Sequence, residues 1–250
     1  MCALKSVEAK NCPLRSIDRE APILIMSLKN SVRSSNNRLL SALAGLPREE
    51  PAILALAAQQ LLITETIRKF GGEVDFAFIG DSITQNFQWT PSWQRLFGSY
   101  RSLNLGLGGD RARNLLWRLE QGLLRDLKVG KIVLLVGIND CWRNPKPEGL
   151  ASEIEFCLKV IKSNCPNSQI LTYGVFPVGE NLRSYQDVIA KTNLCLSKKV
   201  QRQSGVFRDI GPKFLNRNGI SRESFFSDGC HLTQSGYDLW EEDLRKALLA

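Results

Sequence analysis

The sequence predicts an α/β domain in which a parallel five-stranded sheet lies between two layers of helices. Short, almost wholly apolar runs recur along the chain, and helix-length amphipathic segments separate them. Parallel strands that are buried on both faces have this composition and need a helical crossover between them. The clusters of Gly, Asp, Ser and Asn also follow directly after strand-like runs, as expected when ligands bind at the carboxyl edge of such a sheet.

The first 48 residues show no clear hydrophobic period, and we expect a flexible arm there, followed by a single domain over residues 49–250. Residues 26–48 contain no acidic residue and are rich in Ser, Asn, Arg and Leu, a composition that also fits a transit peptide starting from Met26. The first 20 residues carry both Glu and Lys and do not resemble a signal peptide. A cytoplasmic protein is therefore expected, with the transit peptide as the open alternative.

The regular elements can be assigned in order from the start of the domain. Two glutamates precede Pro51, which is a favourable entry to a helix that runs until Arg68-Lys69 and the glycine pair that follows. The strand-like runs then cover residues 74–79, 102–105, 132–136, 169–173 and 206–209. The helix-like segments cover residues 83–97, 111–124, 148–163, 183–203 and 234–249.

Composition excludes several classes of function. The formal net charge is +8, but no run of like charges forms a nucleic-acid footprint. No apolar stretch reaches the roughly 18 residues that a membrane span needs. One His and seven scattered Cys without a C-x-x-C pair do not make a zinc-binding pattern, and free thiols are the simplest interpretation. We expect no nucleic-acid partner, no membrane span and no metal.

Two polar clusters suggest serine chemistry. Residues 80–84 (GDSIT) follow the first strand-like run, and residues 228–231 (DGCH) precede the last helix. A serine hydroxyl is a good nucleophile only when a base takes its proton, and an imidazole base for Ser82 can only be His231. Asp228 is close enough in sequence to hold the Nδ1–H of that imidazole. A helix N-cap role for Ser82 and a surface or core role for His231 remain as alternatives.

Two further loops offer hydrogen-bond donors for a developing negative charge. Gly106, Gly108 and Gly109 let backbone N–H groups approach a ligand closely, and the side-chain amide of Asn139 can donate to an oxyanion. The glycines do not make a dinucleotide-binding G-x-G-x-x-G motif, because Arg111 stands at its last position. The structural alternative is a tight turn at each of these places, namely Gly106, Gly108 and the pair Asn139-Asp140.

Four blocks of the sequence together resemble the SGNH (GDSL-like) hydrolase family. In chain order they are GDSIT at residues 80–84, Asn104-x-Gly106-x-x-Gly109, Gly137-x-Asn139-Asp140 and Asp228-x-x-His231. The resemblance covers roughly residues 72–250, and its only local departure is Ile83, where the family name has Leu. Residues 104–110, 116–119 and 231–237 are further similar to the catalytic subunits of platelet-activating factor acetylhydrolases and their bacterial relatives.

The resemblance implies a flavodoxin-like three-layer α/β/α fold and a serine hydrolase that needs no cofactor. Carried over position by position, Ser82 is the nucleophile, His231 the base and Asp228 the residue that orients the base. The implied oxyanion donors are the backbone N–H groups of Ser82 and Gly109 and the side chain of Asn139. The resemblance thus selects Gly109 among the three glycines.

The expected activity is hydrolysis of short-chain carboxylic esters, acetyl esters above all, of a lipid or sugar alcohol. Trp142 follows Asn139 closely and either lines the leaving-group pocket or packs its own loop. An acyltransferase with the same acyl-enzyme, a thioesterase, and a non-catalytic carbohydrate- or lipid-binding module are the alternatives. The family resemblance also suggests a homodimer.

Overall fold

The computed structural model describes residues 51–203 and 205–249, and the chain divides into two compact units, Met1–Ala58 and Gln59–Ala250. The arm expected at residues 1–48 and the alternative transit peptide from Met26 lie outside the described residues. The first described element, helix α3 (Pro51–Phe70), begins at the predicted proline and ends directly before the glycine pair. No helix in the described ranges is both long and apolar enough to cross a membrane.

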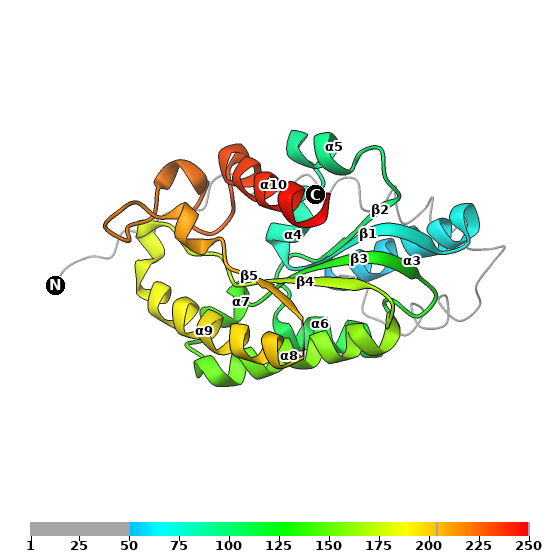
Figure 1. The fold of residues 1–250 in the computed structure, drawn as a ribbon, viewed down its shortest axis with the longest axis horizontal. Helices are drawn as coiled ribbons and strands as arrows, with labels where there is room; N and C mark the ends of the chain where they lie inside the picture. The colour runs from blue at the N-terminus through cyan, green and yellow to red at the C-terminus, as the bar shows by residue number, and fades with distance from the viewer. Residues whose placement is uncertain (1–50, 204, 250) are drawn as a thin grey trace. The chain divides into compact units, whose positions relative to one another are not determined.

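Five parallel strands form one sheet in the second unit, in the order β2-β1-β3-β4-β5 (Figure 1). This is the flavodoxin-like order, and it confirms the predicted fold class. The strands lie within a few residues of their predicted positions: β1 (Glu73–Gly80), β2 (Ser102–Gly106), β3 (Lys128–Leu135), β4 (Gln169–Tyr173) and β5 (Val206–Arg208). The chain reverses its direction of winding between β1 and β3, where such sheets bind their ligands.

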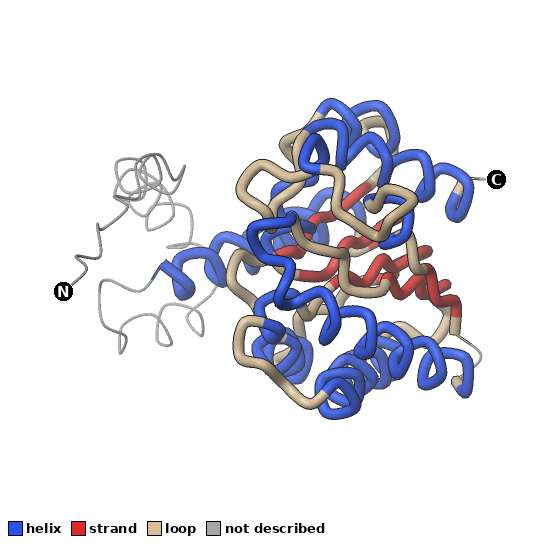
Figure 2. The backbone as a smooth tube through the Cα atoms, turned by 90° about the vertical axis from the view of Figure 1, so that its left-hand side faces the viewer, coloured by secondary structure: helices blue, strands red, loops and turns tan. Residues whose placement is uncertain are grey.

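Helices cover both faces of this sheet (Figures 1 and 2). One face carries α4 (Ser82–Phe87), α5 (Pro91–Phe97) and α10 (Gln234–Leu248). The other face carries α6 (Ala112–Glu120), α8 (Pro147–Asn164) and α9 (Gln186–Arg202). The connections add the one-turn helix α7 (Ile138–Cys141) and three short 3-10 helices: η1 (Glu180–Tyr185), η2 (Gly211–Phe214) and η3 (Glu223–Phe225).

The structure divides the helix predicted over residues 83–97 into α4 and α5. Pro91 has no backbone N–H and cannot continue a helix, whereas it fits the first turn of a new one. Thr90 caps that new helix, because its hydroxyl accepts a hydrogen bond from the Trp93 N–H at 3.2 Å. The one-turn helix α7 was not predicted, since four residues are too few to show a hydrophobic period.

An aromatic cluster holds α4 against the sheet. Phe78 of β1 is fully buried and makes edge-to-face contacts with Phe87, Trp93 and Phe97, at centroid distances of 5.8, 4.9 and 4.8 Å. Trp240 of α10 stacks on Phe87 at 4.8 Å. Each such pair stabilises by about 0.5–1.5 kcal/mol beyond its buried area. The first residue of α4 is Ser82, so this packing fixes the position of the candidate nucleophile.

Candidate active site

Ser82 is the first residue of α4, directly beyond the carboxyl end of β1. Asp81, not Ser82, is the N-cap: its backbone is extended, and its carboxylate accepts the Ile83 N–H at 3.0 Å. The alternative of Ser82 as the helix cap is therefore wrong, and the hydroxyl is left for other contacts. The turn between strand and helix requires glycine at position 80, because a Cβ there would lie 2.0 Å from the Leu135 carbonyl oxygen.

The hydroxyl of Ser82 lies 2.9 Å from Nε2 of His231, although 149 residues separate the two. The other ring nitrogen, Nδ1, lies 2.7 Å from one carboxylate oxygen of Asp228. The second carboxylate oxygen accepts the backbone N–H groups of His231 and Cys230, at 2.7 and 2.9 Å. The structure thus brings the three residues of the predicted triad into one hydrogen-bonded chain.

The electrostatics keep the Asp228 carboxylate ionised. Partial burial alone would raise its pKa, but the hydrogen bonds from the His231 ring and from the two backbone N–H groups outweigh burial. The resulting pKa lies below the ordinary value of 3.8. An ionised acceptor on Nδ1 favours the tautomer whose Nε2 lone pair faces Ser82.

Local backbone contacts shape the loop that carries Asp228 and His231. The Ser227 N–H donates to the His231 carbonyl at 2.8 Å, and Phe226 pairs with Leu232 across the turn. Gly229 has a φ of 87°, and a Cβ there would lie 2.1 Å from the side chain of Asn181. The loop can therefore fold tightly only with glycine at this position.

The glycine loop after β2 passes beside Ser82. A Cβ on Gly108 would lie 3.9 Å from the Cβ of Ser82, and Gly109, at a φ of 79°, has open space where its side chain would stand. Among the described residues, the backbone N–H groups of Ser82 and Gly109 donate to no other group. Gly106 serves packing instead, because a Cβ there would lie 2.4 Å from the Gln85 nitrogen.

Asn139 lies on α7, at the carboxyl end of β3. Its amide donates one hydrogen bond to the Asp110 carbonyl at 2.9 Å. A side-chain amide has a second N–H, which stays available for a ligand. The turn that starts α7 uses Gly137 at a φ of 129°. A tight turn at this position and a role of the Asn139 amide as a hydrogen-bond donor are therefore compatible.

Three buried carboxylates support these loops, and the sequence analysis assigned them no role. Burial raises the pKa of Asp81 to about 7, and the neighbouring Asp110 and Asp140 add to this shift. Burial also raises the pKa of Asp140 to about 6, although its carboxylate accepts the Ala112 N–H at 3.0 Å. Asp110 forms a buried ion pair with Arg118. The available signal was an aspartate in each of the three loops that follow β1, β2 and β3.

Trp142 ends α7 and is half-buried. Its ring meets the ring of Tyr185 edge-on, at a centroid distance of 4.7 Å. Packing of the loop accounts for this position, and a role in the leaving-group pocket stays a prediction.

The five cysteines of the described ranges form no disulfide. Burial raises the pKa of Cys230, the neighbour of His231, to about 12, so that its thiol stays protonated. Within residues 51–203 and 205–249, no group of three or more His, Cys, Asp or Glu side chains is arranged to hold a metal ion.

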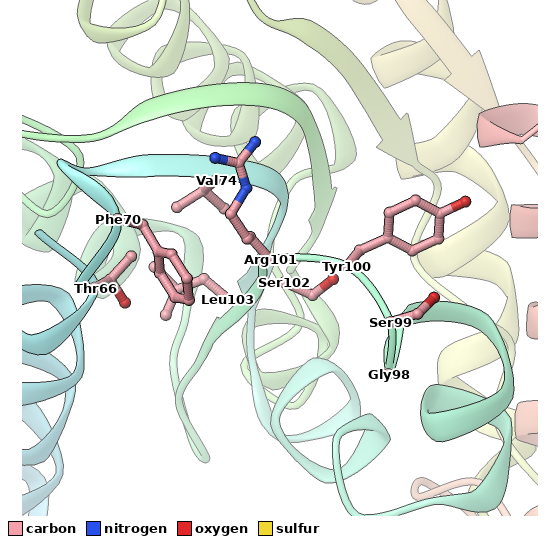
Figure 3. Close-up of a pocket in the computed structure, with 9 residues that line it drawn as sticks. All are labelled: Thr66, Phe70, Val74, Gly98, Ser99, Tyr100, Arg101, Ser102 and Leu103. Carbon is pink, nitrogen blue, oxygen red and sulfur yellow. The ribbon is translucent and has the colours of Figure 1, made fainter.

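Two hollows of about 360 and 520 Å³ lie at the opposite, amino edge of the sheet. Figure 3 shows the first, which is lined by Phe70, Tyr100 and Arg101 among others. The second is lined by Glu73, Asp75 and the start of β3. Neither contains a residue of the hydrogen-bonded chain around Ser82, so the volume of a hollow does not identify the candidate site here.

Comparison with known proteins identifies relatives of this chain in sequence and in fold. Residues 78–239 match the model of the GDSL-like Lipase/Acylhydrolase family. The chain is 35% identical to the platelet-activating factor acetylhydrolase IB subunit alpha2 of Rattus norvegicus over 167 residues, which are 66% of this chain and 72% of the relative. Two solved structures share the fold. One, from Streptococcus pneumonia, has a TM-score of 0.65 at 23% identity, covering 86% of this chain and 100% of its own. The other, a GDSL-like lipase from Bacteroides thetaiotaomicron, has a TM-score of 0.61 at 19% identity, covering 78% and 98%.

Proposed function

This chain belongs to the GDSL-like lipase/acylhydrolase family and is a carboxylic ester hydrolase, and we propose that it cleaves short-chain esters through an acyl-enzyme on Ser82. The observation that carries the proposal is the chain of hydrogen bonds from Asp228 through His231 to Ser82. His231 is the only histidine of the sequence, so no other imidazole can serve as the base.

The first step forms the acyl-enzyme. Oγ of Ser82 attacks the ester carbonyl while Nε2 of His231 takes the hydroxyl proton. The carbonyl oxygen becomes an oxyanion and accepts hydrogen bonds from the backbone N–H groups of Ser82 and Gly109 and from the amide of Asn139. Collapse of the tetrahedral intermediate breaks the bond to the alcohol oxygen, which leaves with the proton from His231.

The second step releases the acid. Water gives a proton to Nε2 of His231 and attacks the acyl carbon, and the oxyanion is held by the same donors. The bond to Oγ of Ser82 then breaks, and the proton returns from His231 to the serine. Asp228 stays ionised throughout and stabilises the imidazolium that forms in each half-reaction.

A small acyl group is the proposed substrate class. The Rattus norvegicus relative is a subunit of an acetylhydrolase, and the proposal for this chain is an acetyl or similarly short ester of a small-molecule, lipid or sugar alcohol. The predicted homodimer and the identity of the alcohol are separate questions, and the assay below does not depend on either of them.

Hydrolysis of p-nitrophenyl esters from acetate to decanoate tests the proposal. We expect turnover to fall with chain length, and Ser82→Ala and His231→Ala to lower kcat by about 10⁴-fold or more. Ser152→Ala is a matched control, because that exposed hydroxyl bonds only its own helix, at the Glu148 carbonyl, and activity should not change. Activity that survives in either triad variant would contradict the proposed nucleophile and base.

Two alternatives give distinct outcomes in the same assay. An acyltransferase forms the same acyl-enzyme but yields the acylated alcohol when alcohols are added, whereas a hydrolase yields the free acid. A non-catalytic binding module gives no turnover and no labelling of Ser82 by a fluorophosphonate. Labelling that requires His231 excludes the binding module, and free acid as the sole product then supports the esterase over the acyltransferase.

A further inference from the structure

Arg118 is a buried cation whose hydrogen-bonding capacity is fully used. Its side chain is 2% exposed, and a guanidinium has five N–H donors. Nε donates to the Asp110 carboxylate at 2.8 Å, and Nη2 donates to the same oxygen and to the Gly80 carbonyl at 3.4 Å. Nη1 donates to the Gln59 side chain at 2.8 Å and to the Leu105 carbonyl at 3.1 Å.

Three of the four acceptor residues, namely Gly80, Leu105 and Asp110, lie at the carboxyl ends of β1 and β2 or in the loop after β2, beside the candidate site. Gly80 ends β1, two residues before Ser82, and its carbonyl also accepts the Leu107 N–H of the glycine loop at 3.0 Å. Gln59, which accepts from Arg118, also donates to the Gly106 carbonyl at 2.9 Å. One side chain therefore fixes the ends of β1 and β2 relative to each other.

The contact with Asp110 reaches the oxyanion donors. Gly109 precedes Asp110, so the position of this residue sets the direction of the glycine loop. The carbonyl of the same Asp110 accepts the Asn139 amide at 2.9 Å and thereby orients its second N–H. A displacement of Asp110 would move both donors together.

We propose that Arg118 is a positioning residue of the esterase reaction, which holds the oxyanion donors in place through Asp110. The inference rests on the proposed function of Gly109 and Asn139 as those donors. Stability alone is a weak reason for such a pair, because the cost of taking two charges out of water commonly offsets their attraction. Displacing a hydrogen-bond donor by about 1 Å can lower the rate by about 10²-fold, so rigid positioning of the oxyanion donors directly affects kcat.

The test is Arg118→Lys, which keeps the charge but has only three N–H donors on one nitrogen and cannot serve all four acceptor atoms. We expect kcat on p-nitrophenyl acetate, per site titrated with a fluorophosphonate, to fall about 10- to 100-fold with little change in KM. In the Asn139→Ala background, Arg118→Lys should lower kcat by a smaller factor than it does in the wild type, because both substitutions act on the same group of donors. If the factors multiply, or if kcat is unchanged, the inference is wrong.

A matched control separates positioning from general stability. Arg208→Lys alters another Arg–Asp pair, with Asp243, that lies on β5 and α10 and touches no proposed donor. Its kcat should stay within about two-fold of the wild type, as expected for a site without shared partners. An equal loss of kcat in this control would assign the effect of Arg118→Lys to stability and overturn the inference.

Two further outcomes keep the proposals distinguishable. If Asn139→Ala alone leaves kcat unchanged, the oxyanion role in the proposed function fails; if it lowers kcat while Arg118→Lys does not, only the inference fails. Should Arg118→Lys not fold, Asp110→Asn is measured in its place, since it removes the negative charge that Arg118 holds and leaves the backbone carbonyl that accepts the Asn139 amide. Arg118 then has a weakened hold on Asp110, so a several-fold loss of kcat is expected, and an unchanged kcat overturns the inference.

Discussion

Each edge of the sheet carries an Arg–Asp ion pair, and the two pairs differ in how far they are buried. At the carboxyl edge, Arg118 pairs with Asp110, and their side chains are 2% and 8% exposed. At the amino edge, Arg101 pairs with Asp75 and Glu73, and these side chains are between 33% and 55% exposed. The two hollows described above also lie at the amino edge, and Figure 3 shows one of them. The two edges therefore differ in whether their Arg–Asp ion pairs are buried or exposed.

The pKa values of Asp81 at the carboxyl edge and Asp75 at the amino edge shift in opposite directions. The pKa of Asp81 rises to about 7 because of burial, whereas the pKa of Asp75 falls because the Arg101 side chain donates hydrogen bonds to it. Strongly shifted groups in one place are typical of functional sites. Burial of the Asp81 carboxylate thus carries a cost in stability that the more exposed Asp75 avoids.

The largest expected contrast between the edges is in catalysis. Asp228→Asn removes the ionised acceptor on Nδ1 of His231, and the imidazole can then present the wrong nitrogen to Ser82. We expect kcat to fall about 10³- to 10⁴-fold. The matched substitution at the amino edge, Asp75→Asn, should leave kcat unchanged. Full activity of Asp228→Asn would remove Asp228 from the mechanism.

A smaller loss is expected when one oxyanion donor is removed. Asn139→Ala deletes the amide while leaving Ser82 and His231 in place, so kcat should fall about 10²- to 10³-fold and KM should change little. Steady-state kinetics on p-nitrophenyl acetate measure both constants. A rise in KM at constant kcat would mean instead that Asn139 binds the ground state of the substrate.

The opposite pKa shifts of Asp81 and Asp75 predict different pH dependences of stability at the two edges. Asp81 has a pKa of about 7 in the folded protein and an ordinary value of 3.8, so the folded state binds more protons in between. Its contribution to stability therefore falls as pH rises from about 4 to 7, by up to about 1.4 kcal/mol per pH unit. The free energy of unfolding of the wild type, relative to Asp81→Asn, should decrease between pH 5 and 7 in urea titrations.

Asp75→Asn provides the comparison for that measurement. A lowered pKa contributes stability that is present above the ordinary value of 3.8 and is lost only as pH falls through the folded-state value. The difference between the wild type and Asp75→Asn should be constant between pH 5 and 7. A constant difference for Asp81→Asn as well would show that Asp81 stays ionised throughout this range.

A weaker effect is expected at the rim of the carboxyl edge. If Trp142 lines the leaving-group pocket, Trp142→Ala should lower kcat/KM about 10-fold for esters of bulky alcohols and leave methyl acetate unaffected. Tyr185→Ala serves as the control for loop packing, because it removes the partner of Trp142. Equal losses on all esters in both variants would assign Trp142 to packing.

The sequence predicts the carboxyl edge better in outline than in detail. The alternation of apolar strands and amphipathic helices is local and repeats five times, so fold class and strand positions follow from it. The local pattern does not show which of two neighbouring residues caps a helix. Asp81 and Ser82 are both suitable N-cap residues, and only the three-dimensional turn shows that Asp81 is the cap. Likewise, the five contacts of Arg118 join segments up to 59 residues apart, which no local pattern indicates.

The smallest expected effect concerns the amino edge itself. Arg101→Gln breaks exposed ion pairs with Asp75 and Glu73, whose attraction is screened by water and salt. We expect unchanged kcat and a smaller shift of the thermal midpoint than for Arg118→Lys, with any shift vanishing at high salt. Scanning calorimetry at low and high ionic strength measures both. A salt-independent loss as large as that of Arg118→Lys would mean that burial does not distinguish the two edges, and the contrast drawn between them would then have to rest on the catalytic residues alone.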